Sequence, residues 1–479
     1  MDTAMRYTKI VATVGPASDT PELLSQLIEA GVNVFRLNFS HGTQDSHRET
    51  IARIREASKL VGKHAAILQD LCGPKIRVGL MENGAVPLAA DSEVVVTTDE
   101  ILGTPEKIQT QYQDLPRDVK PGERLLLDDG AMELVVLRVS GDEIATRVVR
   151  GGMLKNNKGM NLPNIRVSAP SVTEKDLSDL RVGLSEGVDF IALSFIRRAE
   201  DMDPVRLAME NAYSRARLIA KIEKPEAMDH IEDIVRRADG IMVARGDLGI
   251  EMPLQRVPVM QKFLIRLANA NDRYVITATQ MLESMTHNAL PTRAEVSDVA
   301  NAIVDGTDAV MLSGETAAGV DPVRTVEMMS AIACETEAYL TKYRPTWNWR
   351  QTVSSENPLQ DALGHAALRL VEDLDIKAIA VHTQTGGTAL FMSKARPFAP
   401  ILAFTPDSAS ARRLHLYWGV TPIHSPAVGG RSELLVAARR ALLDRKLVKP
   451  GDKILVVTGT NFGQVGGADA ITVATVSED

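Results

Sequence analysis

Cysteine, basic tracts and long apolar runs are all scarce in this chain of 479 residues. The two cysteines, Cys72 and Cys334, exclude a disulfide framework and are typical of a reducing compartment. Residues 1–9 are short and mixed, with no apolar stretch that could act as a signal peptide. No run approaches the roughly 20 apolar residues that span a bilayer. These absences predict a cytoplasmic protein.

The charge balance excludes some partners. Lys and Arg total 54 against 62 Asp and Glu, so the formal charge is −8. A mildly acidic chain without basic tracts argues against nucleic acid or an anionic membrane as the main partner. With 44% hydrophobic and 24% charged residues, the composition is ordinary for a globular protein. The length suggests about three domains, or one large barrel with two smaller units.

Short apolar runs alternate with longer amphipathic segments, which is the pattern of parallel βα units. Before residue 344 we predict eight such strands: residues 9–13, 32–37, 65–69, 190–193, 218–222, 241–244, 274–277 and 309–312. Eight units predict an α/β fold of the (β/α)8 TIM-barrel type. The active site of such a barrel lies at the carboxyl ends of its strands.

Two further regions interrupt and follow the barrel pattern. The gap after the third strand holds alternating β-branched runs at 93–97, 124–127, 132–139 and 143–149, which predict an inserted all-β domain. We assign residues 73–167 to this inserted β-barrel lid, which could cover the active site, and residues 1–72 and 168–344 to the barrel. After a linker at 345–357, strands at 378–382, 401–404, 420–424, 453–458 and 471–476 predict an open α/β domain over 345–479.

Polar residues gather where the predicted barrel strands end. Each strand is apolar until its last residue or two and then carries charged or hydroxyl groups: Arg36 to Gly42, Asp70, Lys221 to Lys224, Arg245 to Asp247, Thr277 to Gln280, and Ser313 to Thr316. Because parallel strands of a barrel end at one face, these groups predict a single catalytic centre.

Glu223 and Asp247 end neighbouring strands, so their carboxylates can reach one point. Two carboxylates with the remaining positions left to water and substrate oxygens suit Mg²⁺. The alternative is that one or both form ion pairs with Lys221, Lys224 or Arg245. Lys221 itself has three readings: it neutralises a transferring phosphoryl group, it is a Schiff-base nucleophile, or it is a buried counter-ion of Glu223.

Other candidates are weaker one by one. Arg36 and Arg77 could bind phosphate oxygens or form ordinary ion pairs. Thr279 could position a proton or be structural, and Ser313 and Glu315 could relay a proton or cap the next helix. Two segments could also hold an anion with backbone amides: the glycine-rich residues 244–249, and residues 383–388, which could equally form a helix cap with a turn.

Several segments together resemble the signatures of the pyruvate kinase family. They occur in the family's order: residues 9–16 (KIVATVGP), 36–42 (RLNFSHG), 221–227 (KIEKPEA), 244–251 (ARGDLGIE), 277–285 (TATQMLESM) and 313–317 (SGETA). The resemblance runs from about residue 8 to the C-terminus. It implies a bacterial-type enzyme of glycolysis that transfers a phosphoryl group from phosphoenolpyruvate to ADP, giving pyruvate and ATP.

The resemblance also implies roles for individual residues. Glu223 and Asp247 would bind Mg²⁺ or Mn²⁺, Lys221 and Arg36 the phosphoryl group, and the Gly246 and Asp247 amides the substrate carboxylate. Thr279, with Ser313 and Glu315, would place the proton that completes pyruvate. Arg77, Lys158, His41 and Asn38 would contact the nucleotide. The family is usually a homotetramer, and Thr383, Thr385, Gly386, Gly387 and Thr388 match its pocket for the phosphate of an allosteric effector.

One segment departs from the common family pattern. After the third strand the family usually has glutamate where this chain has Lys75, and members with glutamate use K⁺ near the equivalents of Asn38, Ser40, Asp70 and Leu71. An ammonium group at Lys75 could supply that charge itself, because a second cation nearby is costly at low dielectric. We therefore predict activity without K⁺.

Two rival functions share part of these features. A metal-dependent carbon–carbon lyase or mutase acting on pyruvate or phosphoenolpyruvate would use the same paired carboxylates but needs no ADP, no inserted domain and neither Arg77 nor Lys158. A metabolite-sensing protein could keep the barrel without its activity, although Lys221, Glu223, Asp247 and Thr279 are all present.

Overall fold

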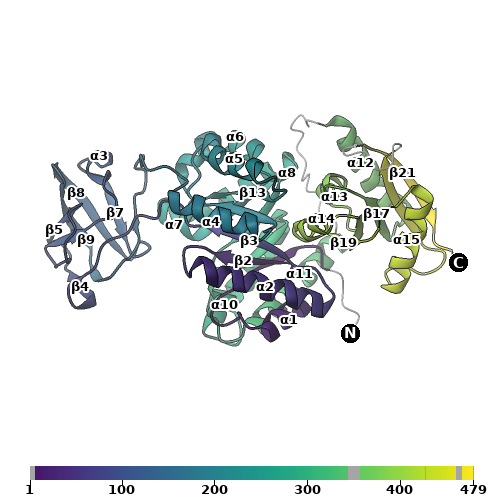
Figure 1. The fold of residues 1–479 in the computed structure, drawn as a ribbon, viewed down its shortest axis with the longest axis horizontal. Helices are drawn as coiled ribbons and strands as arrows, with labels where there is room; N and C mark the ends of the chain where they lie inside the picture. The colour runs from purple at the N-terminus through teal and green to yellow at the C-terminus, as the bar shows by residue number, and fades with distance from the viewer. Residues whose placement is uncertain (1–5, 344–356, 427, 460–466, 478–479) are drawn as a thin grey trace.

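The computed structural model describes residues 6–343, 357–426, 428–459 and 467–477. A central barrel has the inserted all-β domain on one side and the C-terminal domain on the other (Figure 1). The chain enters the inserted domain from one barrel strand and returns to the next, so the three units follow one another in space as inserted domain, barrel and C-terminal domain. None of the helices in the described residues is long and apolar enough to span a bilayer.

The predicted TIM barrel is confirmed. Its strands are all parallel and close in the order β1-β16-β15-β14-β13-β12-β3-β2. They are β1 (Lys9–Thr13), β2 (Val34–Asn38), β3 (Ala66–Leu71), β12 (Phe190–Leu193), β13 (Arg217–Ile222), β14 (Gly240–Ala244), β15 (Tyr274–Ala278) and β16 (Ala309–Leu312). Most are buried along their whole length, which explains their continuous apolar sequence.

The helices around the barrel begin and end with local capping signals. They are α1 (Pro21–Ala30), α2 (Gln44–Val61), α4 (Glu174–Ser185), α5 (Asp203–Asn211), α6 (Ile231–Arg237), α7 (Arg245–Glu251), α8 (Val257–Ala270), α9 (Arg293–Asp305), α10 (Gly314–Ala317) and α11 (Pro322–Tyr343). In α1, the Thr20 hydroxyl accepts from the Leu23 amide, and Gly31 at φ 119° ends the helix in the left-handed conformation. The short α7 carries Gly246 and Asp247 directly after β14.

The inserted domain lies between β3 and α4. Its elements are β4 (Ala85–Leu88), β5 (Glu93–Thr97), β6 (Lys107–Gln109), α3 (Leu115–Asp118), β7 (Arg124–Leu127), β8 (Met132–Ser140), β9 (Glu143–Arg150), β10 (Gly152–Lys155) and β11 (Met160–Asn161). We predicted a β-barrel here, but the hydrogen-bonded strands form a six-stranded sheet, β11-β7-β8-β9-β5-β6, and a separate β10-β4 pair. The two short sheets instead enclose one apolar core.

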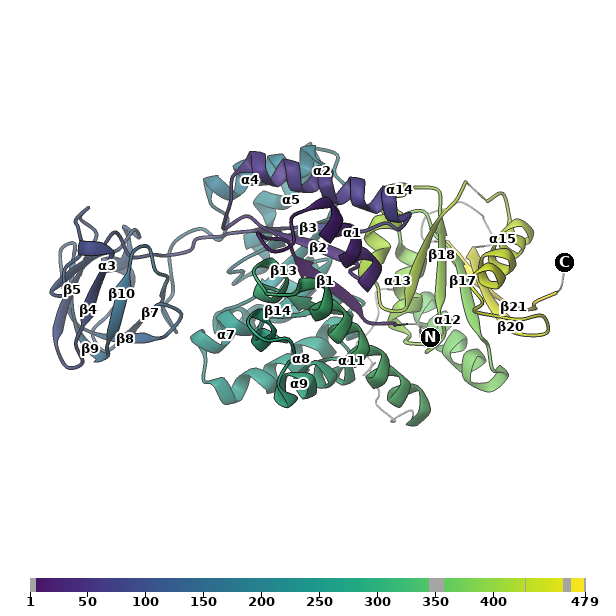
Figure 2. The same cartoon turned by 90° about the horizontal axis from the view of Figure 1, so that it is seen from below.

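The C-terminal domain is an open α/β sheet in the order β19-β18-β17-β20-β21, in which only the edge strand β21 is antiparallel. It contains α12 (Pro358–Leu374), β17 (Ala378–His382), α13 (Gly387–Lys394), β18 (Ile401–Thr405), α14 (Ser408–Arg413), β19 (Val420–His424), α15 (Arg431–Asp444), β20 (Lys453–Gly459) and β21 (Ala468–Thr475). Figure 2 shows α13 and α14 between this sheet and the barrel. Of the linker predicted at 345–357, only residue 357 lies within the described residues. The predicted domain boundaries at residues 72/73, 167/168 and 344/345 stay predictions.

Candidate active site at the barrel mouth

A buried carboxylate lies at the centre of the barrel mouth. Asp70, in β3, is 1% exposed, and its Oδ2 atom is 2.7 Å from Nε of Arg36 in β2. Its Oδ1 atom is 3.2 Å from Nζ of Lys221 in β13. Burial by itself would raise the pKa of Asp70, but the charges of Lys221 and Arg36 outweigh it and lower the pKa. Strands distant in sequence thus bring two cations to one point, as predicted.

Lys221 links this carboxylate to Glu223. Its Nζ atom is 2.8 Å from Oε1 of Glu223, which is also 1% exposed. Burial would lower the pKa of Lys221, yet the carboxylates of Asp70 and Glu223 raise it overall, so the side chain stays charged. A permanently protonated lysine is a poor Schiff-base nucleophile. It is well suited to neutralise a transferring phosphoryl group.

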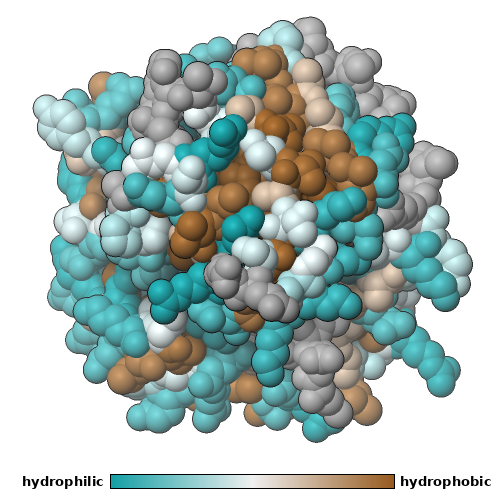
Figure 3. All heavy atoms as spheres, turned by 90° about the vertical axis from the view of Figure 1, so that its right-hand side faces the viewer, coloured by the Kyte–Doolittle hydropathy of each residue, from teal (hydrophilic) through white to brown (hydrophobic). Residues whose placement is uncertain are grey.

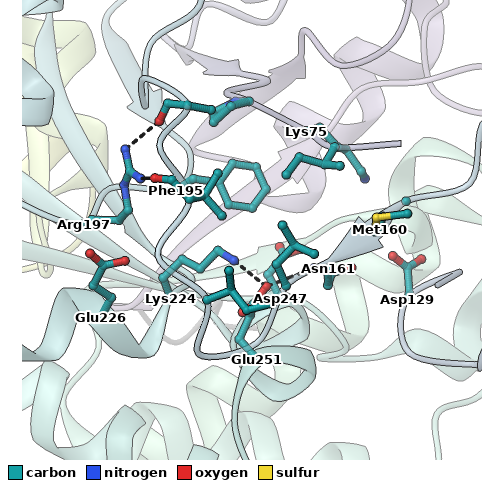
Figure 4. A pocket seen from close by; sticks show the side chains of 17 residues that line it. Lys75, Asp129, Met160, Asn161, Phe195, Arg197, Lys224, Glu226, Asp247 and Glu251 are labelled. Atoms are coloured by element: carbon teal, nitrogen blue, oxygen red, sulfur yellow. Dashed lines mark hydrogen bonds and ion pairs between the residues drawn. The ribbon is translucent and has the colours of Figure 1, made fainter. Parts of the chain in front are cut away.

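Glu223 and Asp247 differ in how their oxygens are used. Glu223 pairs with Lys221 and accepts the Phe195 amide at 2.7 Å. Burial, partly offset by Lys221, raises the pKa of Glu223, and the neighbouring charge of Asp247 raises it further. The Asp247 carboxylate has no hydrogen bond or ion pair with another described residue and lines the pocket at the mouth (Figure 4). Its open oxygens, beside a carboxylate that is costly to keep charged, fit a divalent cation.

Glu223 and Asp247 are too few ligands for a metal site made by protein side chains alone. Among the described residues, no group of three or more His, Cys, Asp or Glu side chains could hold a metal. Mg²⁺ retains waters and commonly takes one or two carboxylates plus substrate phosphate oxygens. Glu223 and Asp247 therefore fit a metal that is completed by substrate and water. The ion-pair alternative holds for Glu223, which does pair with Lys221, and not for Asp247.

Thr279 and Gly246 are in direct contact. The Gly246 amide donates to Oγ1 of Thr279 at 2.7 Å, and that hydroxyl donates to the Ala278 carbonyl at 2.6 Å. Thr279 has φ 70°, a strained conformation for a β-branched residue. The Arg245 guanidinium donates to the Thr279 carbonyl at 2.7 Å and pairs with Asp298, which holds this turn in place. Strain supported by a charged clamp places the hydroxyl beside the metal candidates.

Glu315 and Ser313 lie behind the mouth. Glu315 is fully buried, and its two oxygens accept the amides of Ser313 at 2.6 Å and Leu282 at 3.2 Å. The Ser313 side chain does not cap α10, and its buried hydroxyl has no partner among the described residues. Glu315 thus orders two loops, and the alternative prediction of a helix cap is wrong for the Ser313 side chain. The unpartnered Ser313 hydroxyl is compatible with the proton relay.

The nucleotide candidates come from both sides of the mouth. Arg77 donates to the Asn157 carbonyl at 2.9 Å, and Lys158 pairs with Asp128 at 2.8 Å, all in the inserted domain. Asn38 ends β2 beside Asp70, and its side chain accepts the Ser40 amide. Partial burial, then the charges of Lys75, Arg77 and Arg36, lower the pKa of His41. These three cations therefore share one electropositive region at the entrance.

The monovalent-cation pocket is only partly as predicted from sequence. Asn38, Asp70 and Leu71 lie together, and the Leu71 carbonyl accepts the Ser194 hydroxyl at 2.8 Å. The Lys75 ammonium makes no ion pair with a described residue, and Figure 4 shows its side chain on the side of Met160 and Asp129. Arg36 and Lys221 already balance Asp70. Occupation of this pocket by Lys75 stays a prediction.

The predicted effector loop begins α13 in the C-terminal domain. Thr383 is buried, and its hydroxyl accepts the Gly386 amide at 2.9 Å, which is the turn expected from the structural alternative. Gly386 has φ 101°, so a side chain there would be strained. A Cβ atom placed on Gly387 would have no described atom within 4 Å, so the space beside this residue is open. Thr385 and Thr388 are half-buried beside this space.

Sequence reasoning missed two residues that hold the centre together. The Ser194 hydroxyl accepts from Lys221 Nζ at 2.7 Å and donates to Leu71, and the Phe195 amide binds Glu223. Both directly follow β12, at the same strand-end position that identified the other groups. The six polar strand ends predicted from sequence do not include this one, where a single serine hydroxyl follows the strand.

Comparison with known proteins agrees with this geometry. Residues 5–326 match the family described as pyruvate kinase, barrel domain, and residues 361–474 match its alpha/beta domain. The chain is 48% identical over 476 residues to a pyruvate kinase of Geobacillus stearothermophilus, covering 99% of this chain and 81% of that protein. It is 44% identical to that of Staphylococcus aureus strain MRSA252, with the same coverage. A pyruvate kinase structure from Cryptosporidium parvum superposes with a TM-score of 0.92 at 35% identity, over 98% of this chain and 96% of that one.

Proposed function

Because this chain belongs to the pyruvate kinase family and is a phosphotransferase, we propose that its barrel mouth transfers the phosphoryl group of phosphoenolpyruvate to ADP with the help of a divalent metal. The observation that carries the proposal is Lys221, fixed between Asp70 and Glu223 and next to the open carboxylate of Asp247. This arrangement offers both positive charge and metal ligands to one phosphoryl group.

Glu223 and Asp247 would hold Mg²⁺ or Mn²⁺. When bound, the ion would neutralise charge on phosphoryl and carboxylate oxygens. Asp70 holds Arg36 and Lys221 in place through ion pairs, and Glu223 also pairs with Lys221, so both cations can bind the transferring group without reorganisation. Their side chains are each 11% exposed, and this partial exposure leaves them in reach of a ligand.

The second half of the reaction requires a proton on the enolate that remains. The Thr279 hydroxyl is held by Gly246 and Ala278. Thr279 follows β15, which lies in the barrel between β14, followed by Asp247, and β16, followed by Ser313. We assign it to proton placement, with the Ser313 hydroxyl behind it. The substrate carboxylate would accept the hydrogen bonds of the Gly246 and Asp247 amides. The Gly246 amide would then no longer donate to Thr279, and the Thr279 hydroxyl would be free to place the proton.

ADP would bind between the inserted domain and the barrel. Arg77 and Lys158 approach from the inserted domain, and His41 and Asn38 from the end of β2 and the turn that follows it. Lys75 adds charge to this entrance, as its effect on His41 indicates. Activity should therefore not need K⁺. Steady-state rates in K⁺-free buffer test this, and strong activation on adding K⁺ would refute it.

Regulation and assembly belong to the same proposal. The open Gly387 turn at the start of α13 supports binding of an effector phosphate at residues 383–388. Figure 3 shows apolar side chains gathered on the face of the C-terminal domain. On α12, α15 and β21, Leu359, Val436 and Val473 are exposed, and no strand of the described residues pairs with the outer edge of β21. An exposed apolar edge of this kind supports a homotetramer. The two cysteines support a cytoplasmic location.

A coupled pyruvate assay tests the central proposal. Pyruvate should form from phosphoenolpyruvate only when ADP and Mg²⁺ or Mn²⁺ are both present. Pyruvate released without ADP would favour a lyase and refute the proposal. The same assay with a panel of phosphorylated metabolites identifies the effector, and sedimentation measures the oligomeric state.

A further inference from the structure

Glu251 is a buried carboxylate that the reaction described above does not use. It ends α7, the short helix that begins with Arg245, Gly246 and Asp247. The residue is 3% exposed, so its charge is removed from water at the point where the inserted domain meets the barrel. A carboxylate in such a place is costly unless it has partners. Its partners therefore indicate what the position is for.

Both partners of Glu251 lead to the active site. Lys224 directly follows the metal candidate Glu223, and its Nζ atom is 2.8 Å from Oε1 of Glu251, with side chains 14% and 2% exposed. Asn161, in β11 of the inserted domain, donates to the same oxygen at 3.3 Å. Figure 4 shows the Lys224–Glu251 contact beside Asp247. One oxygen thus joins the end of β13, the end of α7 and the inserted domain.

The other oxygen of Glu251 is unsatisfied. Oε2 is buried and has no hydrogen-bond partner among the described residues. Glu251 also lines a cavity of about 290 Å³ at the junction, together with Asn164 and Arg166 from the segment that returns to the barrel. Arg166 is exposed and makes no ion pair with a described residue. A buried acceptor without a donor, on a residue that lines the same cavity as an exposed cation, fits a second position of the inserted domain in which the two meet.

We propose that Glu251 is a positioning residue that couples the inserted domain to the metal end of the barrel. In the present arrangement it holds Lys224 and Asn161. When the inserted domain moves onto bound nucleotide, Oε2 receives the Arg166 guanidinium, and the contact at Lys224 fixes Glu223 and Asp247. The inference rests on the proposed phosphoryl transfer, because it assumes that ADP binds at this junction.

Kinetics of three variants test the coupling. Glu251→Leu removes both oxygens, and we expect KM for ADP to rise by roughly tenfold or more, within the range of ordinary coupling between sites. Glu251→Gln keeps an acceptor for Asn161 but loses the charge, so the rise should be smaller, about fivefold. Arg166→Gln should raise KM for ADP in the same direction. Binding of phosphoenolpyruvate, measured directly, should change less than twofold because its groups lie within the barrel.

A matched control comes from the outer side of the inserted domain. Glu143→Gln breaks the exposed ion pair between Glu143 and Lys107, whose side chains are 51% and 34% exposed, and it should leave every constant unchanged. Small-angle scattering should show compaction when ADP and Mg²⁺ are added to the native protein and to Glu143→Gln, and less compaction in Glu251→Leu.

The outcomes separate the two proposals. A native protein that forms no pyruvate from phosphoenolpyruvate and ADP contradicts the proposed function. An active native protein whose Glu251→Gln and Glu251→Leu variants fold and keep KM for ADP and compaction within twofold of native overturns the coupling alone. A fall in kcat with unchanged KM, in proportion to lost folded protein, assigns Glu251 a purely structural role and also overturns it.

Discussion

The two ends of the barrel each contain one carboxylate between two cations. At the mouth, Asp70 lies between Arg36 and Lys221, at 2.7 and 3.2 Å. At the floor, Asp308 lies between Lys394 and Arg396 of the C-terminal domain, at 2.6 and 2.8 Å. Both carboxylates are 1% exposed. The local electrostatics are alike, and yet the two places do different things.

The difference lies in what surrounds the cations. At the floor, Lys394 is fully buried and also donates to Asn269, while Arg396 stacks over the Trp418 ring. At the mouth, both cations stay partly exposed, and Lys221 lies within the electrostatic reach of Asp247, whose carboxylate has no partner among the described residues. A charge cluster that is closed off from solvent joins two domains, whereas one that stays open to solvent can bind a ligand. Access to the cations, rather than the presence of charge, distinguishes a joint from a site.

The largest effect should follow from removing the carboxylate of the Asp308 ion pairs at the floor of the barrel. Asp308→Asn leaves Lys394 and Arg396 buried with no compensating charge, and removing one partner of a buried pair costs about 3–5 kcal/mol. We expect a lower unfolding midpoint in urea, while kcat per folded molecule changes little. As a control, Asp375→Asn removes only an exposed partner of Lys377 and should leave the midpoint near native. A stable Asp308→Asn with greatly reduced kcat would reverse the comparison.

The mouth should show the opposite pattern. Glu223→Gln removes a charged metal ligand, and losing one preorganised electrostatic contact costs about 10²–10³ in kcat. The unfolding midpoint should stay close to native, because burial already disfavours the charged form of Glu223. Wild-type turnover in this variant would show that the metal assignment is wrong. Circular dichroism confirms that the variant is folded.

Metal addition sharpens the same contrast. A ligand at a hundredfold excess over its Kd stabilises the native state by about 2.7 kcal/mol. Mg²⁺ should therefore raise the unfolding midpoint of the native protein, and Asp247→Asn should abolish most of that increase. Asp308→Asn should show the same Mg²⁺-dependent increase, although its unfolding midpoint without Mg²⁺ is lower. An equal Mg²⁺ response in Asp247→Asn would place the ion elsewhere.

The smallest effect concerns pH at the floor. Burial, then the charge of Arg6, lowers the pKa of Lys9 to about 7, and its Nζ atom donates to the Val420 carbonyl. Below that pH the lysine is charged in both states. Above it the native state has lost a proton that the unfolded chain keeps, so stability rises with pH by about 1 kcal/mol per unit. Stability of Lys9→Met should lack this rise between pH 7 and about 8, because above that pH Lys394, whose pKa burial lowers to about 8, adds a rise of its own. Lys377→Met, at an exposed position, should keep it.

Much of the barrel could be predicted from sequence because its strands are short, apolar and followed at once by charge. Residues 9–13, 190–193 and 309–312 agree with β1, β12 and β16 to the residue. The strand ends also brought Arg36, Asp70, Lys221 and Glu223 together correctly. The three-residue β6 and the two-residue β11 were missed, because so short a run carries no detectable alternation.

Other parts of the site could not be predicted, because they depend on uncharged or distant groups. Ser194 follows its strand as a lone hydroxyl, and its local sequence does not indicate that Lys221 is its partner. Glu251 lies in residues 244–251, where the sequence pattern indicates a role only for the glycines and Asp247. Its contact with Asn161 joins residues 90 positions apart, and only the fold creates it. Position at a strand end is readable from sequence, and partnership across domains is not.

The inserted domain leaves no gap where it enters the barrel. β3 pairs directly with β12, with Asp70 opposite Ala192 and Leu71 opposite Leu193, although more than a hundred residues separate them along the chain. The ring of strands is therefore closed without the insertion. The barrel therefore does not need the inserted domain to close. A variant in which a short linker joins Leu71 to α4 should still have a folded ring of strands and bind metal, but its affinity for ADP should be lost.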